Sequence, residues 1–324
     1  MMENRGHRLN DTVRPPDAGT SHESASFPDY LKAVPQYFYP QHLLSLLMRG
    51  IARIRVPWIK DRQIRWFIRW YGVDMREALD SDPTSYENFN KFFTRALAPN
   101  ARPTMSNRHI RSPADGRISA FGTIDSTIDG GGIVQAKGHG YTVTKLLAGN
   151  AEDADAFAEP FVDGQFITVY LSPRDYHRVH MPIAGNLRGM RYMPGRLFSV
   201  NAATTRVIPG LFTRNERVVM RFDTANGPLA VVMVGAIFVG GIETVWADAI
   251  TPSHGQSTSI WRYDNLPPDD PKHLELAFPQ GQEIARFNMG STVILLFPRG
   301  GINWEPSLQM GAPLQMGSPI GTPT

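Results

Sequence analysis

The chain has 324 residues, of which 42% are hydrophobic, so it is long enough to bury a full core as one large domain or two small ones. It contains no cysteine, which excludes disulfides, thiolate nucleophiles and cysteine-ligated metal sites. Its formal net charge of +3 is too small to indicate nucleic-acid binding across the surface, and no run approaches the roughly 20 apolar residues that a membrane-spanning helix needs.

The N-terminal part is predicted to be a polar tail followed by helices. Residues 1–28 are polar, lack the apolar segment of a signal peptide and are expected to be disordered. Beyond them, one helical stripe runs from Leu43 to Ile54, and a second, after Pro57, holds Ile64 and Tyr71. A third helix is expected over residues 85–96, with four aromatic side chains facing inward: Tyr86, Phe89, Phe92 and Phe93.

The first two of these helices concentrate positive charge. Between residues 49 and 69 a single acid, Asp61, stands against seven basic residues: Arg49, Arg53, Arg55, Lys60, Arg62, Arg65 and Arg69. Three tryptophans, Trp58, Trp66 and Trp70, are interleaved with them. One interpretation is an interfacial membrane helix, because arginine attracts anionic headgroups and tryptophan favours the membrane boundary. The other is an ordinary surface helix with a solvated basic face. We predict a helical, membrane-associating region over residues 29–100.

From about residue 108 the pattern changes to short strands between Gly, Pro and Asn residues. Strands are expected over seven runs: Arg117–Ile124, Gln165–Leu171, Gly185–Met193, Glu216–Phe222, Pro228–Phe238, Ile242–Ala247 and Thr292–Phe297. Two more helices are expected at Tyr141–Leu147 and Ala151–Phe157. We therefore predict an α+β fold, in which a β-rich, mostly antiparallel core over residues 101–302 is joined to an N-terminal layer of amphipathic helices. Residues 303–324, poor in charge, are expected to be a tail.

Two histidines form the first candidate site. His177 and His180 stand three residues apart in a proline-bracketed turn beside Asp175, directly after an apolar strand. As metal ligands they would need a third partner, which Asp115 offers. As catalytic groups, one of them would be a general base. The remaining interpretation is a pair of surface histidines in a loop.

Two further clusters complete the candidate site. Asp115 lies in the turn Pro113–Gly116, where an aspartate can close the turn and can also fix the tautomer of a histidine base. Ser291 follows Gly290 and precedes an apolar strand. It either opens that strand or acts as a nucleophile, and the nearest carbonyl for its hydroxyl is that of Gly290.

Taken together, these clusters resemble one family, the pyruvoyl-dependent phosphatidylserine decarboxylases of the bacterial type (prokaryotic type I). The resemblance covers roughly residues 28–300 and includes four further stretches in the same order: Gln135–His139, Pro194–Asn201, Leu211–Arg217 and Ile242–Ala247. One departure is Met289, where the family usually has leucine. Methionine is apolar and of similar volume, so the packing is expected to tolerate it.

The resemblance implies that the chain cleaves itself between Gly290 and Ser291. His180 would take the proton of the Ser291 hydroxyl while Asp115 orients the imidazole, with Asp175 as the alternative orienting acid. The hydroxyl would then attack the Gly290 carbonyl and replace the amide by an ester. Elimination and hydrolysis would leave a covalent pyruvoyl group at position 291, so that the cofactor is made from the chain itself and no metal is needed.

The resemblance also implies what the processed protein does. The pyruvoyl group would form a Schiff base with the amine of phosphatidylserine, and His177 would donate a proton after loss of CO2, giving phosphatidylethanolamine. The products of cleavage would be a large β chain, residues 1–290, and a small α chain, residues 291–324, which remain together as a heterodimer and pair further into a homodimer.

A lipid substrate places the enzyme at a membrane. We expect a peripheral protein at the cytoplasmic face of the cell membrane, attracted to an anionic surface, without a transmembrane segment and without nucleic acid as a partner. Two other classes remain open: a serine hydrolase that uses the same Ser–His–Asp set on an external ester, and a non-enzymatic membrane-binding β-domain whose polar clusters are only turns. The mass of the purified protein separates the three.

Overall fold

The computed structural model describes residues 25–102, 108–136, 139–239, 241–251, 257–264 and 276–324. Most of the predicted disordered segment, residues 1–24, lies outside this range. Eight α-helices are described: α1 (Phe27–Ala33), α2 (Gln41–Ala52), α3 (Pro57–Tyr71), α4 (Phe89–Phe93), α5 (Val143–Ala148), α6 (Ala154–Ala158), α7 (Ala202–Val207) and α8 (Leu211–Arg214). Three 3₁₀ helices cover Val34–Tyr37, Met75–Glu77 and Glu159–Phe161.

The strands of the described residues begin in the middle of the chain and continue to its end. They are β1 (Ile110–Arg111), β2 (Gly116–Thr123), β3 (Gly132–Ala136), β4 (His139–Thr142), β5 (Gln165–Tyr170), β6 (Arg178–His180), β7 (Gly185–Met193), β8 (Arg217–Thr224), β9 (Gly227–Val234), β10 (Ile242–Thr244), β11 (Asp248–Ala249), β12 (Ser259–Arg262), β13 (Ala277–Phe278), β14 (Glu283–Phe287), β15 (Thr292–Phe297), β16 (Asn303–Trp304), β17 (Pro313–Leu314) and β18 (Pro319–Thr322). The α+β prediction is confirmed, and β7 and β15 have the predicted bounds.

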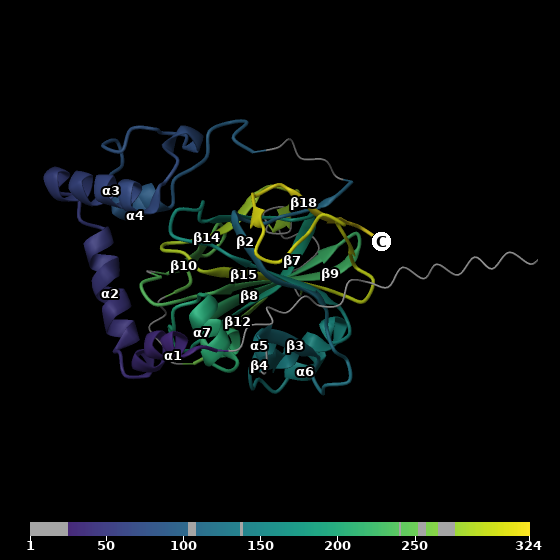
Figure 1. The fold of residues 1–324 in the computed structure, drawn as a ribbon. Helices are drawn as coiled ribbons and strands as arrows, with labels where there is room; N and C mark the ends of the chain where they lie inside the picture. The colour runs from purple at the N-terminus through teal and green to yellow at the C-terminus, as the bar shows by residue number, and fades with distance from the viewer. Residues whose placement is uncertain (1–24, 103–107, 137–138, 240, 252–256, 265–275) are drawn as a thin grey trace, which may run out of the picture.

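A nine-stranded antiparallel sheet forms the centre of the molecule (Figure 1). Its order is β12-β7-β8-β9-β15-β5-β2-β17, and β13 also pairs with β7. A second sheet, β11-β10-β14-β6, brings β6 beside β14. All six residues of β15 are buried, because β5 and β9 flank it and apolar side chains cover both faces. Gly290 and Ser291 therefore lie directly before a strand that is buried over its whole length.

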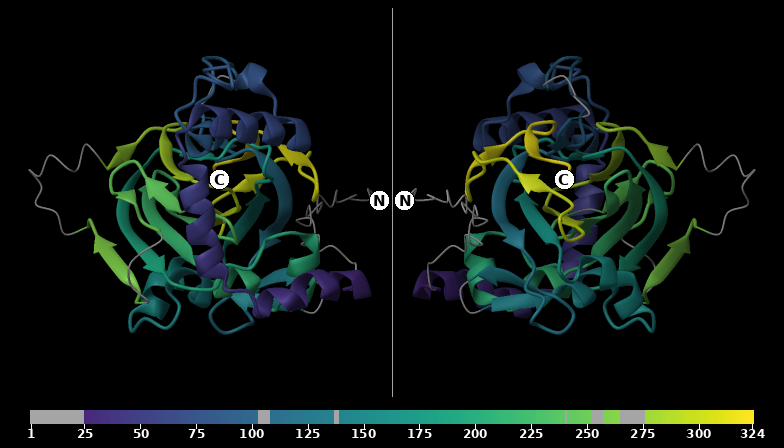
Figure 2. Two further views of the ribbon diagram at one scale, coloured as in Figure 1. Left: turned by 90° about the vertical axis from the view of Figure 1, so that its left-hand side faces the viewer. Right: turned by 90° about the vertical axis from the view of Figure 1, so that its right-hand side faces the viewer.

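The N-terminal helices form an arm along one side of this β-rich body, with α1 at one end and α3 and α4 at the other (Figures 1 and 2). Pro57 starts α3, and Gly72, with a left-handed φ of 67°, ends it. A separate apolar cluster lies between α3 and α4 and includes Ile64, Phe67 and Phe92. The buried aromatic face of the predicted third helix is confirmed for Phe89, Phe92 and Phe93.

The third helix is shorter than predicted, since α4 spans only Phe89–Phe93. The Asn88 side chain accepts a hydrogen bond from the Lys91 backbone N–H and fixes the start of the helix, so the residues before it form turns instead. The C-terminal segment also differs from the predicted tail. It contains β16, β17 and β18, and β18 lies between β1 and β16. These strands have two to four residues, too few for their alternation to be read from a Gly- and Pro-rich sequence.

Candidate active site

The three polar clusters meet around the loop between β14 and β15. The backbone N–H of Phe287 donates to the carbonyl of His177 at 3.0 Å, and that of His180 donates to the carbonyl of Pro113 at 2.8 Å. On the other side, the N–H of Leu171 donates to the Ser291 carbonyl at 2.7 Å. Pairing of β6 with β14 and of β5 with β15 thus brings together segments that are far apart in the sequence.

Gly290 and Ser291 occupy a tightly filled space. A Cβ atom built on Gly290 would lie 2.0 Å from Nε2 of His177, so no other residue fits without displacing the ring. Ser291 is 2% exposed, and its hydroxyl oxygen has no hydrogen-bond partner among the described residues. A buried hydroxyl without a partner is uncommon in a folded protein. The Ser291 hydroxyl is thus committed to no other group among the described residues.

His177 is fully buried beneath the helical arm. Its ring lies 4.1 Å, between centroids, from that of Phe93 in α4. Burial, followed by the positive charge of Arg95, lowers its pKa to about 3, while a weak interaction with the Asp175 backbone acts in the opposite direction. Neither ring nitrogen makes a hydrogen bond of normal geometry within the described part of the chain. The imidazole is therefore neutral at physiological pH and faces the Gly290–Ser291 bond.

His180 has both ring nitrogens engaged. Nδ1 lies 2.8 Å from the Gly281 carbonyl, which can only accept, so Nδ1 carries the proton. Nε2 is then the acceptor for the Tyr176 hydroxyl at 2.9 Å. Burial is the main cause that lowers the pKa of His180 below its usual value, and this shift is opposed first by the hydrogen bond to Gly281, then by the charge of Glu283 and least by that of Asp115. His180 is thus a neutral base whose tautomer is fixed by a backbone carbonyl.

Asp115 is held by groups other than His180. Its carboxylate accepts two hydrogen bonds from Arg102 and one, of 2.7 Å, from the backbone N–H of Met316. Arg102 also pairs with Glu77 at 3.0 Å. No hydrogen bond among the described residues joins Asp115 to the His180 ring, so the structure places the predicted acid near the predicted base without direct contact.

Asp175, the alternative acid, closes its own turn. Its carboxylate accepts from the backbone N–H and the hydroxyl of Ser172, both at 2.7 Å. Burial raises its pKa. Among the described residues, no hydrogen bond joins this carboxylate to the ring of His177 or His180, so Asp175 is a structural part of the loop.

Sequence reasoning missed the groups that support the site. Arg102, Tyr176 and Met316 bind the predicted residues, and Asn90 in α4 binds the loop that carries Gly290. Tyr176 lies between Asp175 and His177, inside the predicted cluster. Of these supporting residues, it alone could have been found from its position in the sequence. Met316 acts through its backbone, which no side-chain pattern can indicate.

The geometry also bears on metal binding and on ligand sites outside the three clusters. The described residues hold no group of three or more His, Cys, Asp or Glu side chains arranged to bind a metal ion.

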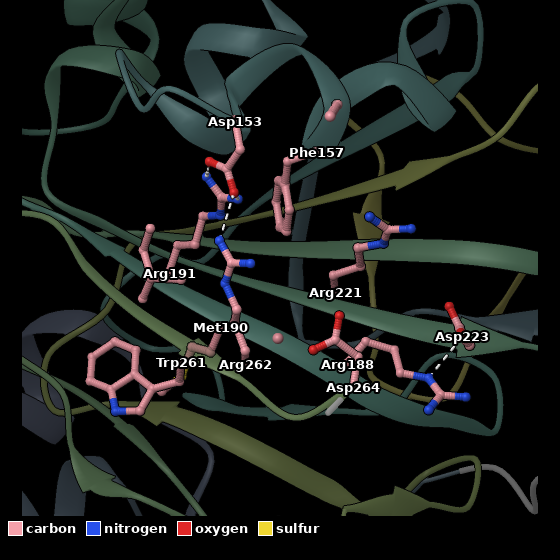
Figure 3. A pocket seen from close by; sticks show the side chains of 13 residues that line it. Asp153, Phe157, Arg188, Met190, Arg191, Arg221, Asp223, Trp261, Arg262 and Asp264 are labelled. Carbon is pink, nitrogen blue, oxygen red and sulfur yellow. Dashed lines mark hydrogen bonds and ion pairs between the residues drawn. The ribbon is translucent and has the colours of Figure 1, made fainter. Parts of the chain in front are cut away.

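Away from the three clusters, a cavity of about 360 Å³ is lined by four arginines, among other residues (Figure 3). Three of these are ion-paired with aspartates, as shown for Arg262 with Asp153 and for Arg188 with Asp223. Arg221 is the fourth, and its guanidinium lies 5.7 Å from the Phe157 ring.

Comparison with known proteins identifies the family. The family model described as phosphatidylserine decarboxylase matches residues 89–322, which include all three clusters, and a second model, described as PSD, matches residues 31–72. The chain belongs to the phosphatidylserine decarboxylase family. The family resemblance of the sequence is thereby confirmed, and the close relatives of the chain are carboxy-lyases.

The family relatives are similar over nearly their full length. The phosphatidylserine decarboxylase proenzyme of Stutzerimonas stutzeri is 49% identical over 90% of this chain and 94% of its own. Those of Bordetella pertussis and Pseudomonas paraeruginosa are both 50% identical over 92% of this chain, and over 96% and 99% of their own, respectively. No helix in the described ranges is both long and apolar enough to cross a bilayer.

Proposed function

We propose that the chain is a proenzyme that cleaves itself between Gly290 and Ser291 and then decarboxylates phosphatidylserine to phosphatidylethanolamine. The observation that carries the proposal is the closed space shared by Gly290, the unpartnered Ser291 hydroxyl and the neutral His177 ring. The relatives named as proenzymes support both halves of it.

Self-cleavage uses groups that are already in the chain. His180, neutral and with its tautomer fixed, takes the proton of Ser291, and the Asp115 carboxylate stabilises the resulting imidazolium through space. The Ser291 oxygen attacks the Gly290 carbonyl carbon, the imidazolium returns the proton to the nitrogen as the C–N bond breaks, and an ester forms. Loss of the Cα proton of residue 291 to a base and elimination across Cα–Cβ then release the Gly290 carboxylate and leave a dehydroalanine. Water adds to its imine tautomer, and the nitrogen leaves as ammonia.

The residues around position 291 fit the pyruvoyl group that this sequence of steps leaves. Position 291 is buried, the glycine leaves no side chain in the way, and the His177 imidazole lies beside it. The ketone would supply an electron sink for loss of CO2 from the bound amine. His177 would hold the proton that is delivered to the substrate α-carbon, because its nitrogens make no competing hydrogen bond of normal geometry within the described part of the chain.

The helical arm would place this site at a lipid surface. Phe27 in α1, Phe38 between α1 and α2, and Leu43 in α2 are 75%, 82% and 65% exposed. On α3, three tryptophans lie on the exposed side with three exposed arginines: Trp58, Trp66, Trp70, Arg62, Arg65 and Arg69. Lys60, by contrast, is buried and paired with Asp61, so it does not contribute to the basic surface. We propose peripheral binding to an anionic membrane, at the cytoplasmic face of the cell membrane.

The test is the mass of the purified protein. Wild type should give a fragment of residues 1–290 and a 34-residue fragment (324 − 291 + 1) whose N-terminus is blocked to sequencing. Ser291→Ala should remain a single 36.1 kDa chain without decarboxylase activity. An active wild-type preparation that contains only intact chain would exclude the proposal in favour of a serine hydrolase.

A further inference from the structure

The scissile loop is attached to the helical arm by a buried polar contact. Asn90 in α4 is 8% exposed, and its Nδ2 donates to the Asn288 backbone carbonyl at 2.9 Å and to the Asn288 side-chain oxygen at 3.1 Å. An amide nitrogen has two protons, so both donors of Asn90 are committed to the residue two positions before Gly290.

Asn288 is in turn bound to the β-rich body. It is 1% exposed, and its own Nδ2 donates to Glu243 in β10 at 2.7 Å. Its backbone N–H donates to the Gly241 carbonyl at 2.8 Å. The start of the loop is therefore fixed from two sides, by α4 and by the segment around β10.

The next residue is held by the same helices. Met289 packs against the apolar cluster between α3 and α4. From α4 as well, Phe93 covers the ring of His177, the group that faces Gly290. Helix α4 thus contacts Asn288 directly, two residues before Gly290. The same helix lies over the His177 ring beside the Gly290–Ser291 bond.

We propose that Asn90 is a positioning residue for self-cleavage. By holding Asn288, it sets the course of the loop so that the Ser291 hydroxyl meets the Gly290 carbonyl. A displacement of the reacting atoms by about 1 Å lowers the rate of such a reaction on the order of a hundredfold. The loop between β14 and β15 has no regular secondary structure that would prevent such a displacement. This inference rests on the proposed self-cleavage.

The experiment is a time course of cleavage in freshly synthesised full-length precursor. Asn90→Ala should cleave about 10- to 100-fold more slowly than wild type. Asn90→Asp, which keeps the shape but loses both donors, should be slowed by a similar factor. Asn88→Ala is the matched control, because Asn88 caps the same helix through the Lys91 N–H, as part of α4 rather than of the loop. It should cleave within about twofold of wild type.

A double-mutant cycle separates positioning from general destabilisation. Asn288→Ala removes the side-chain acceptor of Asn90 and keeps the backbone carbonyl. The two defects should therefore be less than additive: Asn90→Ala should slow the Asn288→Ala precursor by a clearly smaller factor than it slows wild type. Thermal melting of each precursor in the uncleavable Ser291→Ala background reports stability separately. Should Asn90→Ala not fold, the isosteric Asn90→Asp carries the same comparison.

Three results would overturn the inference: wild-type rates in both Asn90 variants, equal slowing by Asn88→Ala at equal melting temperature, or fully additive defects in the cycle. Failure of the proposed function is a different result. In that case wild type and Ser291→Ala would both stay intact throughout the time course, whatever residue occupies position 90.

Discussion

His177 Nε2 lies 2.0 Å from the point where a side chain on Gly290 would begin. Glycine is therefore required at position 290 because the neighbouring imidazole ring occupies the space of a side chain. The flexibility of the glycine backbone is less important there. The two residues share one buried space, so a change in either one alters the surroundings of the bond.

Gly290→Ala should block cleavage. The methyl group must displace the His177 ring, and the loop with it, so we expect at least a hundredfold slower cleavage, measured as loss of the 36.1 kDa chain over time. Gly50→Ala is the control, because a Cβ there meets nothing within 4 Å. Normal cleavage of Gly290→Ala would mean that the ring does not occupy this space in the reacting chain.

The buried neutral state of His177 should make the precursor less stable in acid. Its pKa is about 3 in the folded chain, against about 6.5 for an unperturbed histidine, so between these values only the unfolded chain takes up the proton. The contribution of His177 to the free energy of unfolding should then fall as the pH falls below about 6.5, by at most about 1.4 kcal/mol per pH unit. Denaturant titrations of Ser291→Ala at pH 5 to 7 (about the range of histidine titration) measure this slope, and His177→Gln should reduce it.

Replacing His177 should separate the two proposed reactions. We expect His177→Ala to cleave and to lose decarboxylation by a factor of about 100 or more, because a proton donor contributes roughly that much. Fragment masses and release of CO2 are measured on the same preparation. Loss of cleavage as well would show that His177, which lies beside the bond, acts in the first reaction too.

The rate of cleavage should depend on pH through His180. Because burial lowers its pKa, the cleavage rate should be constant near neutral pH and decline in acid, with its midpoint below the usual value for histidine. Tyr176→Phe removes a hydroxyl that donates to the neutral ring and so should move the midpoint upward. An unchanged profile in Tyr176→Phe would argue against His180 as the base.

Membrane binding should depend on the exposed side of α3. Joint replacement of Trp58, Trp66 and Trp70 by alanine should reduce flotation with phosphatidylserine-containing vesicles by at least about tenfold, since each ring contributes apolar area at the interface. Alanine at Ile128, Val134 and Ile260, which are also exposed but lie outside the arm, is the matched control and should leave flotation unchanged. Equal effects of the two sets would remove the arm as the binding surface.

The sequence predicted those parts of the fold that have long apolar patterns. Six strands of the central sheet (β2, β5, β7, β8, β9 and β15) and helix α3 were predictable because each buries a regular stripe or run. Helix α2 was predictable from its periodicity, although Leu43 and Leu47 of its apolar stripe are exposed. The strands of the C-terminal segment were not predictable, since their pairing with β1 and β2 depends on contacts across the whole chain. Composition alone cannot distinguish such a segment from a loose tail.

The site shows the same division. Motifs identified Asp115, His177, His180 and Ser291, and the structure brings their segments together. The partners of these residues could not be predicted in the same way. Arg102 binds Asp115 from the region after the helical arm, and the Gly281 carbonyl fixes His180 through an atom that every residue possesses. Met289 packs against the apolar cluster between α3 and α4, where an apolar side chain is sufficient.

The central position of β15 has a consequence for the processed molecule. Cleavage before Ser291 would open the chain immediately before a strand that already pairs with β5 over its whole length and with β9 over all but its last residue. The small fragment would also keep β17 on β2 and β18 on β1, so it is interwoven with the large one and held without any new association step. The two pieces would behave as a nicked single protein: they should remain in one-to-one ratio, and activity per molecule should not fall on dilution.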